Sequence, residues 1–301
     1  MRALVTGATG FVGRHLLAQL ERPIVLSRDG ARAERLLAEY AVRAFSWDAQ
    51  NEPAPAQAFE DVEVVFHLAG EPVAQGRWTR AKKARLRDSR VTGTRNLVRT
   101  LAKLEHKPRT LISASAVGYY SDRGDETLDE SASPGKDFLA EICVAWEEES
   151  QKAADAGIRV VNLRIGIVLG SGGGALAKML TPFKFGLGSS LGHGRQWMSW
   201  IHLDDLIGIM LFAARCDQIR GPINATAPNP VTNRQFTKAL GKALRRPTVL
   251  PSVPGIVLRL GMGEFASVLL ASQKAIPRAA QAAGYEFVHS QLEEALQDIL
   301  D

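Results

Sequence analysis

Short apolar runs alternate with amphipathic stretches through the first half of the chain. The runs with the length and composition of strands are 2–6, 23–26, 44–48, 62–68, 109–115 and 158–163. Helical spacing of apolar residues separates them and predicts helices near 11–20, 31–40, 80–104 and 138–156. This alternation is typical of an α/β fold with a Rossmann-type, doubly wound, mostly parallel sheet, to which 222–225 adds a seventh strand.

The pattern changes after residue 165. Residues 166–194 are rich in glycine, and residues 196–202 mix aromatic with polar side chains, which suits a pocket wall better than a core helix. The residues expected to line the substrate pocket are Phe183, Gln196, Trp197 and Trp200. The segment 121–135 is polar and acidic, and its composition predicts a mobile loop.

Helix signals continue to the end of the chain. Asp204 is predicted to cap an apolar helix that ends at Arg215, and Thr232 to cap a helix over 233–244. Later helical patterns lie near 255–272, 274–283 and 290–300. The expected domains are a cofactor-binding Rossmann domain at 1–165, to which 203–226 returns, and a smaller α-rich substrate lobe at 166–301 with a C-terminal helical segment at about 248–301.

A glycine turn lies between the first predicted strand and the first predicted helix. It reads Val5-Thr6-Gly7-Ala8-Thr9-Gly10-Phe11-Val12-Gly13. In a dinucleotide-binding βα unit, the first glycine makes the turn, the second lets a pyrophosphate approach the backbone, and the third lets the helix pack on the strand. The free N–H groups of the helix start would face the phosphates. The turn therefore predicts a nucleotide site.

The end of the second strand bears on the choice of cofactor. It reads Ser27-Arg28-Asp29, where this fold meets the adenosine ribose. An acid there would accept from the ribose hydroxyls of NAD, whereas Ser27 and Arg28 could hold the 2′-phosphate of NADP. We favour NADP(H), although Asp29 leaves NAD open unless its side chain turns away.

Other strand ends supply further candidates. Ala69-Gly70 follows the fourth strand, where small residues let a cofactor approach, and His67 before them is expected to be a buried, satisfied imidazole. Most basic residues of 77–90 are expected on a solvated face, but Arg90 could point at the phosphates. The fifth strand delivers Ser113, Ser115, Tyr119 and Tyr120 to the carboxyl edge of the sheet, where ligands bind in such folds.

Composition excludes several other classes. The net charge is +5 over 301 residues, without basic runs interleaved with aromatics or zinc-type spacing, so neither nucleic acid nor a metal is expected. Cys143 and Cys216 are far apart and are expected to be buried free thiols. The chain enters its first strand directly after Met1-Arg2, and no run could span a bilayer, so a cytoplasmic protein is expected.

Linked motifs along almost the whole chain resemble a known family. The chain is similar to the extended short-chain dehydrogenase/reductases, and within them to the atypical NAD-dependent epimerase/dehydratase-like "epimerase family" proteins of the YfcH type. The matching motifs are Thr6-Gly7-x-x-Gly10-x-x-Gly13, Ala69-Gly70, Ser113–Ser115, Phe138-Leu139-Ala140-Glu141, Trp146-Glu147, 163–170, 172–176, 186–188, 199–202, 273–277 and 284–287.

The resemblance implies a cofactor site, a catalytic set and a substrate. The cofactor is NADP(H), and the residues expected to bind it are Gly7, Thr9, Gly10, Phe11, Val12, Gly13, Ser27, Arg28, Leu68, Ala69, Gly70, Arg90, Ser113 and Ile165. The catalytic set of the family is Ser, Tyr and Lys, in which tyrosinate moves the proton and lysine lowers the tyrosine pKa. The implied partner is a small molecule, in this family often a nucleotide sugar, and a homodimer is left open.

The chain departs from the family at the catalytic helix. Ser115 matches the catalytic serine, but Phe138 stands near the tyrosine position, Ile142 follows four residues later, and no tyrosine has a lysine four positions on. Tyr119 or Tyr120 could substitute from the strand-five loop, with Arg123 or Lys136 as the cation, or could merely pack at the rim. Two hypotheses follow: an NADP(H)-dependent oxidoreductase or epimerase-like enzyme, and a non-catalytic NADP(H)-binding sensor or scaffold.

Overall fold

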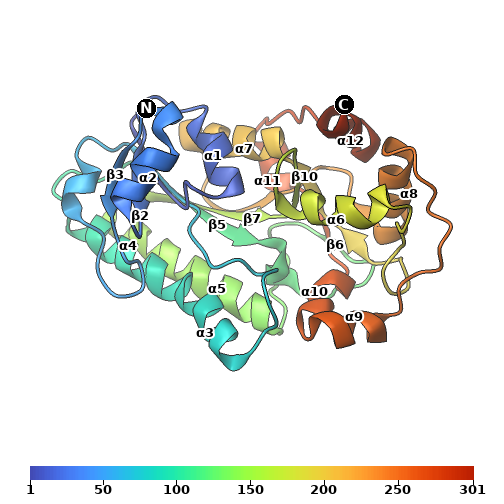
Figure 1. The fold of residues 1–301 in the computed structure, drawn as a ribbon. Coiled ribbons are helices and arrows are strands. Elements are labelled where there is room, and N and C mark those ends of the chain that lie inside the picture. The colour runs from blue at the N-terminus through green and yellow to red at the C-terminus, as the bar shows by residue number, and fades with distance from the viewer.

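One seven-stranded parallel sheet organises the computed structural model, which describes residues 1–301 (Figure 1). Its strand order is β11-β7-β5-β4-β1-β2-β3. The strands are β1 (Ala3–Thr6), β2 (Ile24–Ser27), β3 (Arg43–Ser46), β4 (Val64–His67), β5 (Thr110–Ala116), β7 (Arg159–Ile165) and β11 (Gly221–Ala225). The predicted Rossmann-type sheet is confirmed. The strand order reverses between β1 and β4, which is where open α/β sheets bind ligands.

Most residues of the central strands are apolar because helices cover both faces of the sheet, although β3 at the edge is partly exposed and β7 carries Arg159, Asn162 and Arg164. Successive residues point to opposite faces. In β1, Val5 packs with α1 (Phe11–Leu17), α2 (Gly30–Leu36) and α7 (Leu203–Arg215), whereas Leu4 packs with α4 (Val91–Lys103) on the other side. In β7, Val161 packs on the same face of the sheet as Val5, and Val160 packs on the same face as Leu4. The helix α5 (Phe138–Gln151) lies beside α4 (Figure 1).

The predicted helix over 80–104 is two helices, not one. The chain bends between α3 (Arg80–Asp88) and α4, at Ser89 and Arg90. Both side chains reach the loop after β4: the Ser89 hydroxyl accepts from the Glu71 N–H at 3.0 Å, and Arg90 Nη1 donates to the Glu71 carbonyl at 3.1 Å. No glycine or proline stands at the bend itself, and Gly93 lies inside α4, so these tertiary contacts account for the bend.

The remaining elements build a smaller lobe around its own core. Two small sheets pair β8 (Ile167–Leu169) with β10 (Trp200–His202), and β9 (Trp197–Met198) with β12 (Val231–Thr232). The lobe's helices are α6 (Gly174–Lys184), α8 (Asn233–Ala243), α9 (Gly255–Met262), α10 (Phe265–Leu270) and α12 (Leu292–Leu300). Thr232 caps α8, as predicted, and the structure shows that it forms a capping box with Gln235. The predicted cap at Asp204 is wrong, since the His202 imidazole accepts from the Asp204 N–H.

Distant segments tie the lobe to the sheet. The helix α11 (Arg278–Ala282) packs on β11 through Ala280. Within 121–135, β6 (Thr127–Leu128) pairs with β13 (Lys274–Ala275), and Glu130 accepts from the N–H groups of Asn224 and Ala279. The predicted mobile loop is thus held by long-range hydrogen bonds. Four 3₁₀ helices complete the chain: η1 (Ala38–Tyr40), η2 (Ala56–Phe59), η3 (Val117–Tyr120) and η4 (Lys152–Ala156).

No helix of the structure combines the length and the apolar character that a membrane-crossing helix needs.

Candidate cofactor and substrate sites

The glycine turn opens into a cavity of about 350 Å³ at the carboxyl ends of β1, β2 and β4. Eight of the residues predicted to bind the cofactor line it together: Gly7, Thr9, Gly10, Ser27, Arg28, Leu68, Ala69 and Gly70. Trp47, Asp48 and Gln50 complete the wall near Arg28. Segments far apart in sequence therefore meet at the strand-order reversal, as a dinucleotide site in this fold requires.

The three glycines of the turn are needed for different reasons. Gly7 has φ +70°, and a Cβ there would lie 2.8 Å from the Leu68 carbonyl carbon. A Cβ on Gly13 would lie 2.7 Å from Ala8 Cα, so α1 can pack on the turn only without one. A Cβ on Gly10 would meet only the Gly7 carbonyl oxygen, at 3.2 Å. The protein itself therefore needs Gly7 and Gly13, whereas Gly10 leaves open space on the cavity side, which fits an approaching phosphate group.

A buried threonine–histidine network fixes the far wall of this cavity. The Thr6 hydroxyl accepts from the N–H groups of Leu68 and Ala69, each at 3.1 Å, so its own proton goes to His67 Nδ1 at 2.8 Å. His67 Nε2 then donates to the Thr94 hydroxyl at 2.9 Å. Burial lowers the pKa of His67 to about 4. The expected satisfied imidazole is confirmed, and it stays neutral while it ties β1, β4 and α4 together.

The acidic and basic side chains at the end of β2 are engaged differently. Asp29 caps α2, because its Oδ1 accepts from the Arg32 N–H at 2.9 Å. Arg28 is exposed, lines the cavity and makes no ion pair. Hydrogen bonds from Asn51 and Gln50, with a smaller contribution from the Arg28 charge, lower the pKa of the nearby Asp48. The acid that kept NAD open is therefore engaged elsewhere, and the cation is free.

The other predicted cofactor residues lie around the cavity and do not line it. Arg90 stacks its guanidinium 5.2 Å from the Trp146 ring centre and lies against Gly70, at the end of the cavity away from Arg28. Burial lowers its pKa. Ser113 is fully buried inside β5, and Ile165 is half-buried where β7 ends. In α1, Phe11 and Val12 are half-buried, and both pack against the apolar core on that face of the sheet.

The predicted catalytic serine belongs to a buried polar network. Ser115 donates to Glu147 Oε1 at 2.6 Å, and Glu147 in turn binds Arg164 through two contacts of 3.0 and 2.9 Å. The side chains of Arg164 and Glu147 are 3% and 12% exposed, so this ion pair is shielded from water. Burial opposes the charge on Arg164, but Glu147 outweighs that effect and raises its pKa.

Both candidate tyrosines contact the same arginine. The Arg164 guanidinium carbon lies 3.5 Å from the Tyr119 ring centre, and its Nη1 donates to the Tyr120 hydroxyl at 3.0 Å. Tyr120 is fully buried and donates to Asn224 Oδ1 at 2.7 Å. Burial raises the pKa of Tyr120 to about 12, and burial also raises the pKa of Tyr119. Both hydroxyls therefore stay protonated at neutral pH, and only Tyr119 is partly accessible.

The cation beside the tyrosines is not one of those expected. Arg123 pairs with Glu126 and Lys136 is exposed, whereas Arg164 takes the central place. Sequence reasoning missed the roles of Arg164 and Glu147. A signal was present, since a charged residue inside the apolar β7 run needs a partner, and Glu147 lies next to Trp146 on the inner side of α5. At the helix start, Phe138 is half-buried and Ile142 is buried. Neither side chain has an ionisable group, so neither supplies acid–base chemistry.

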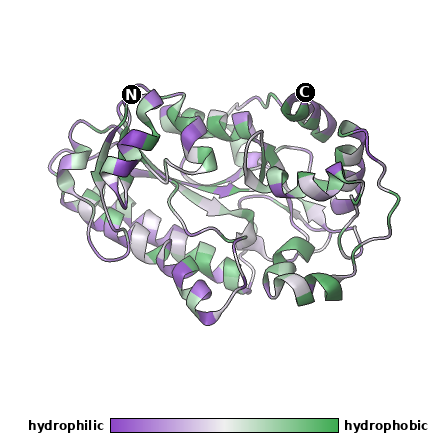
Figure 2. Ribbon diagram, viewed as in Figure 1, coloured by the Kyte–Doolittle hydropathy of each residue, from purple (hydrophilic) through white to green (hydrophobic).

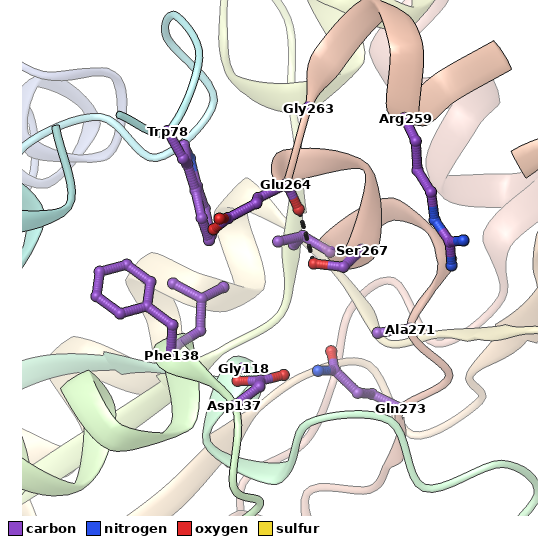
Figure 3. A pocket seen from close by; sticks show the side chains of 12 residues that line it. Trp78, Gly118, Asp137, Phe138, Arg259, Gly263, Glu264, Ser267, Ala271 and Gln273 are labelled. Carbon is purple, nitrogen blue, oxygen red and sulfur yellow. Dashed lines mark hydrogen bonds between the residues drawn. The ribbon is translucent and has the colours of Figure 1, made fainter. Parts of the chain in front are cut away.

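A second cavity, of about 500 Å³, lies between the start of α5 and the α9–α10 segment (Figure 3). Gly118 and Leu139 line it on the side of the sheet. Gly118 directly precedes Tyr119, and Leu139 directly follows Phe138, which stands near the position of the family's catalytic tyrosine. Trp78 and Phe138 contribute aromatic rings, and Arg259, Glu264, Ser267 and Gln273 provide polar groups. This cavity is the candidate substrate site.

The predicted aromatic wall of the substrate pocket does not line this cavity. Phe183 and Trp200 belong to the core of the lobe, and Trp200 has no exposed surface. Gln196 is buried, and Trp197 donates its indole N–H to Asp125 at 2.8 Å. The glycines that suggested an open wall instead allow close packing, because a Cβ on Gly188 would lie 2.5 Å from the Phe183 ring.

Comparisons with known proteins match nearly the whole chain to one family. Residues 3–225 match the model of the NAD dependent epimerase/dehydratase family, and residues 253–299 match a domain of unknown function, DUF1731. "Epimerase family protein Mb2239" of Mycobacterium bovis is 41% identical over 97% of this chain and 95% of its own. "Epimerase family protein YfhF" of Bacillus subtilis is 38% identical over 100% and 98%.

A solved structure extends the likeness to three dimensions. The human epimerase family protein SDR39U1 (isoform 2), crystallised with NADPH, superposes with a TM-score of 0.89 at 31% identity and covers 100% of this chain and 99% of its own. The sheet, the glycine-lined cavity and these matches together show that the chain belongs to the NAD dependent epimerase/dehydratase family, as one of its atypical extended short-chain dehydrogenase/reductase members.

Proposed function

We propose that this chain is an NADP(H)-dependent oxidoreductase or epimerase-like enzyme that acts on a small molecule. The observation that carries the proposal is the 350 Å³ cavity, in which the glycine turn and the unpaired Arg28 lie together. In this proposal residues 1–165, with 203–226, bind the cofactor, and 166–301 mainly shape the substrate site. A reducing cytoplasmic setting agrees with the two free thiols, of which Cys143 is buried and Cys216 is half-buried.

Arg28 is proposed to select NADP(H) over NAD(H). A guanidinium binds phosphate through charge-assisted hydrogen bonds, and Ser27 beside it can add a hydroxyl donor. Asp29 does not compete, because it caps α2. The NADPH in the human SDR39U1 structure is in keeping with this choice. Arg90, at the other end of the cavity, is proposed to support the part of the cofactor beyond the pyrophosphate.

The residues of the strand-five edge would then serve the reaction. When bound, the nicotinamide supplies hydride transfer to or from carbon. Tyr119 keeps its proton at neutral pH because burial raises its pKa, so it suits donation of a proton to a carbonyl oxygen better than removal of one from an alcohol. Ser115 would orient the substrate oxygen, and the buried Tyr120 would hold Arg164 in place. This assignment favours reduction with NADPH.

A non-catalytic NADP(H) sensor or scaffold is the second candidate. One observation favours it: the Ser115 hydroxyl is 2.6 Å from Glu147, turned toward α5, and the serine is only 3% exposed. A substrate would have to take this hydrogen bond away from a carboxylate. Once a substrate is found, turnover that Ser115→Ala and Tyr119→Phe leave unchanged would refute the catalytic assignment, whereas loss of turnover with intact NADPH binding would exclude the sensor.

The cofactor assignment is tested with Arg28→Ala and the matched control Arg32→Ala, an exposed arginine of the adjacent helix. Isothermal titration should show wild-type protein binding NADPH more tightly than NADH. Loss of charge-assisted bonds to the 2′-phosphate should weaken NADPH about 10- to 100-fold and leave NADH unchanged. Arg32→Ala should keep the wild-type preference. Equal wild-type affinities for the two cofactors would refute the role of Arg28.

A further inference from the structure

We propose that the 500 Å³ cavity takes a planar, largely apolar molecule with a single negative charge, which Arg259 binds. The proposal rests on the proposed function only in treating this cavity as the substrate site, since the binding it describes needs no turnover. It names a substrate class unlike the nucleotide sugars that the family resemblance implies.

The walls of the cavity are suited to a flat ring. The Trp78 and Phe138 rings meet edge to face, with centroids 5.5 Å apart, and the Phe265 ring centroid lies 6.0 Å from that of Trp78. The Trp78 indole N–H already donates to the Val73 carbonyl at 3.0 Å, so the ring offers the cavity apolar surface only. Aromatic walls of this kind favour stacked or edge-to-face contact with a planar ligand.

Most polar groups around the cavity are already engaged. Asp137 accepts from the Ala140 N–H at 2.9 Å as the cap of α5, Glu264 pairs with Lys83, and the Ser267 hydroxyl donates to the Glu264 carbonyl at 2.7 Å. Two side chains remain without a hydrogen bond or ion pair, Arg259 and Gln273. In Figure 3 they lie on the side of the cavity away from the Trp78 and Phe138 rings.

The charges of the wall set the charge of the ligand. Arg259 is the one unpaired cation that lines the cavity, and two carboxylates, Asp137 and Glu264, share the same wall. A nucleoside diphosphate brings at least two negative charges and needs several cations or free amides. One free guanidinium matches one carboxylate, with the Gln273 amide as a second donor. The cavity therefore fits an apolar monoanion and lacks the cations for a diphosphate.

The element that carries Arg259 is itself apolar. Hydrophobic residues cover α9 and α10, and Ile256 and Leu260 of α9 are exposed (Figure 2). The α9–α10 segment is joined across the cavity by the bond from Arg77 to the Leu260 carbonyl at 2.8 Å and by the Lys83–Glu264 pair. On the lobe side, Val268 and Ala271 are the apolar side chains that line the cavity itself.

The test uses ligand-observed NMR on the full chain, with and without saturating NADPH. The probes are 1-naphthoate, its uncharged analogue 1-naphthamide, and UDP-glucose. Wild-type protein should bind naphthoate about tenfold more tightly than naphthamide, as expected for charge-assisted bonds. Arg259→Gln should abolish that difference, and Arg246→Gln, an exposed arginine outside the cavity, should preserve it. Trp78→Ala should weaken both naphthalene probes.

Each contrary result overturns the proposal. Equal affinities for naphthoate and naphthamide, no binding of either, an unchanged preference in Arg259→Gln, or tighter binding of UDP-glucose than of naphthoate would contradict it. Failure of the proposed function is read separately, as absence of NADPH binding in the same samples, because the naphthoate titration without NADPH still reports on the cavity.

Discussion

Acid should destabilise this protein through one buried histidine beside the cofactor cavity. His67 is wholly enclosed and bonded to the Thr6 and Thr94 hydroxyls, and burial lowers its pKa to about 4. In the unfolded chain the same imidazole has its ordinary pKa of about 6.5. Between these two pKa values the imidazole is protonated in the unfolded state but not in the folded state, so the free energy of unfolding decreases as the pH falls.

The size of the effect follows from the two pKa values. A difference of about 2.5 pH units at about 1.4 kcal/mol per unit is worth about 3 kcal/mol. This stabilisation is fully present above about pH 7, is lost as the pH falls from about 6.5 to about 4, and does not change further below that. Small domains are stable by only about 5–15 kcal/mol, so the loss should be readily measured.

The assay is urea unfolding at pH 7.0, 6.0, 5.0 and 4.5 for wild type, His67→Gln and the control His106→Gln. Glutamine can occupy the space between the two threonines but cannot titrate, so the pH dependence of His67→Gln should be smaller than that of wild type by the contribution of His67. His106 is exposed, and its replacement should leave the wild-type slope. His202, whose pKa burial and His289 lower, contributes equally in all three proteins. Parallel slopes for wild type and His67→Gln would refute the reasoning.

Three further predictions follow from local contacts. Gly13→Ala should destabilise the fold by about 2 kcal/mol in urea unfolding, because its Cβ would overlap the Ala8 backbone; stability equal to wild type would contradict this packing. Glu147→Gln leaves the buried Arg164 charge unpaired and should cost about 3 kcal/mol, whereas the exposed neighbour Glu148→Gln should cost under about 0.5 kcal/mol; equal losses would argue against the buried pair. Burial raises the pKa of Cys143 to about 12, so iodoacetamide at pH 8 should label Cys216 well before Cys143 in native protein, as mass spectrometry would show; the reverse order would contradict the burial.

The features of the sequence that predicted the structure well are local ones. The glycine turn needs only the residues from Val5 to Gly13, and the Gly7 and Gly13 contacts explain why glycine stands there. The strands were found because a sheet covered on both faces gives continuous apolar runs. Thr232 predicted the start of α8 because a capping residue directly precedes the helix in sequence.

The features that the sequence did not predict depend on contacts between distant segments. The bend at Ser89 and Arg90 comes from Glu71, and the hydrogen bonds of 121–135 come from Asn224 and the chain near Lys274. Glycine and aromatic residues of 166–200 suggested an open wall, but they fit together as a core. The cavity beside the start of α5 is lined by Trp78 and by residues of α9–α10, which no pattern within one segment could join.

The candidate site divides in the same manner. Residues that line the glycine-turn cavity at strand ends could be found in order along the chain, because parallel strands bring their carboxyl ends to one edge. The Ser115–Glu147–Arg164 network crosses from β5 to α5 to β7, so the partner of each charge was not visible in sequence. The absence of the Tyr–Lys pair could be recognised from the sequence, because it depends only on which residue types stand at those positions.

The central claim is that the glycine-turn cavity binds NADP(H), and titration of NADPH into wild type and Gly10→Val tests it most directly. Gly10 has an extended backbone that a β-branched residue adopts without strain, and a side chain there points to open space apart from the Gly7 carbonyl. Wild type should bind one NADPH per chain, and Gly10→Val should unfold at the same temperature yet show no binding. Undiminished NADPH binding by a folded Gly10→Val protein would contradict the account.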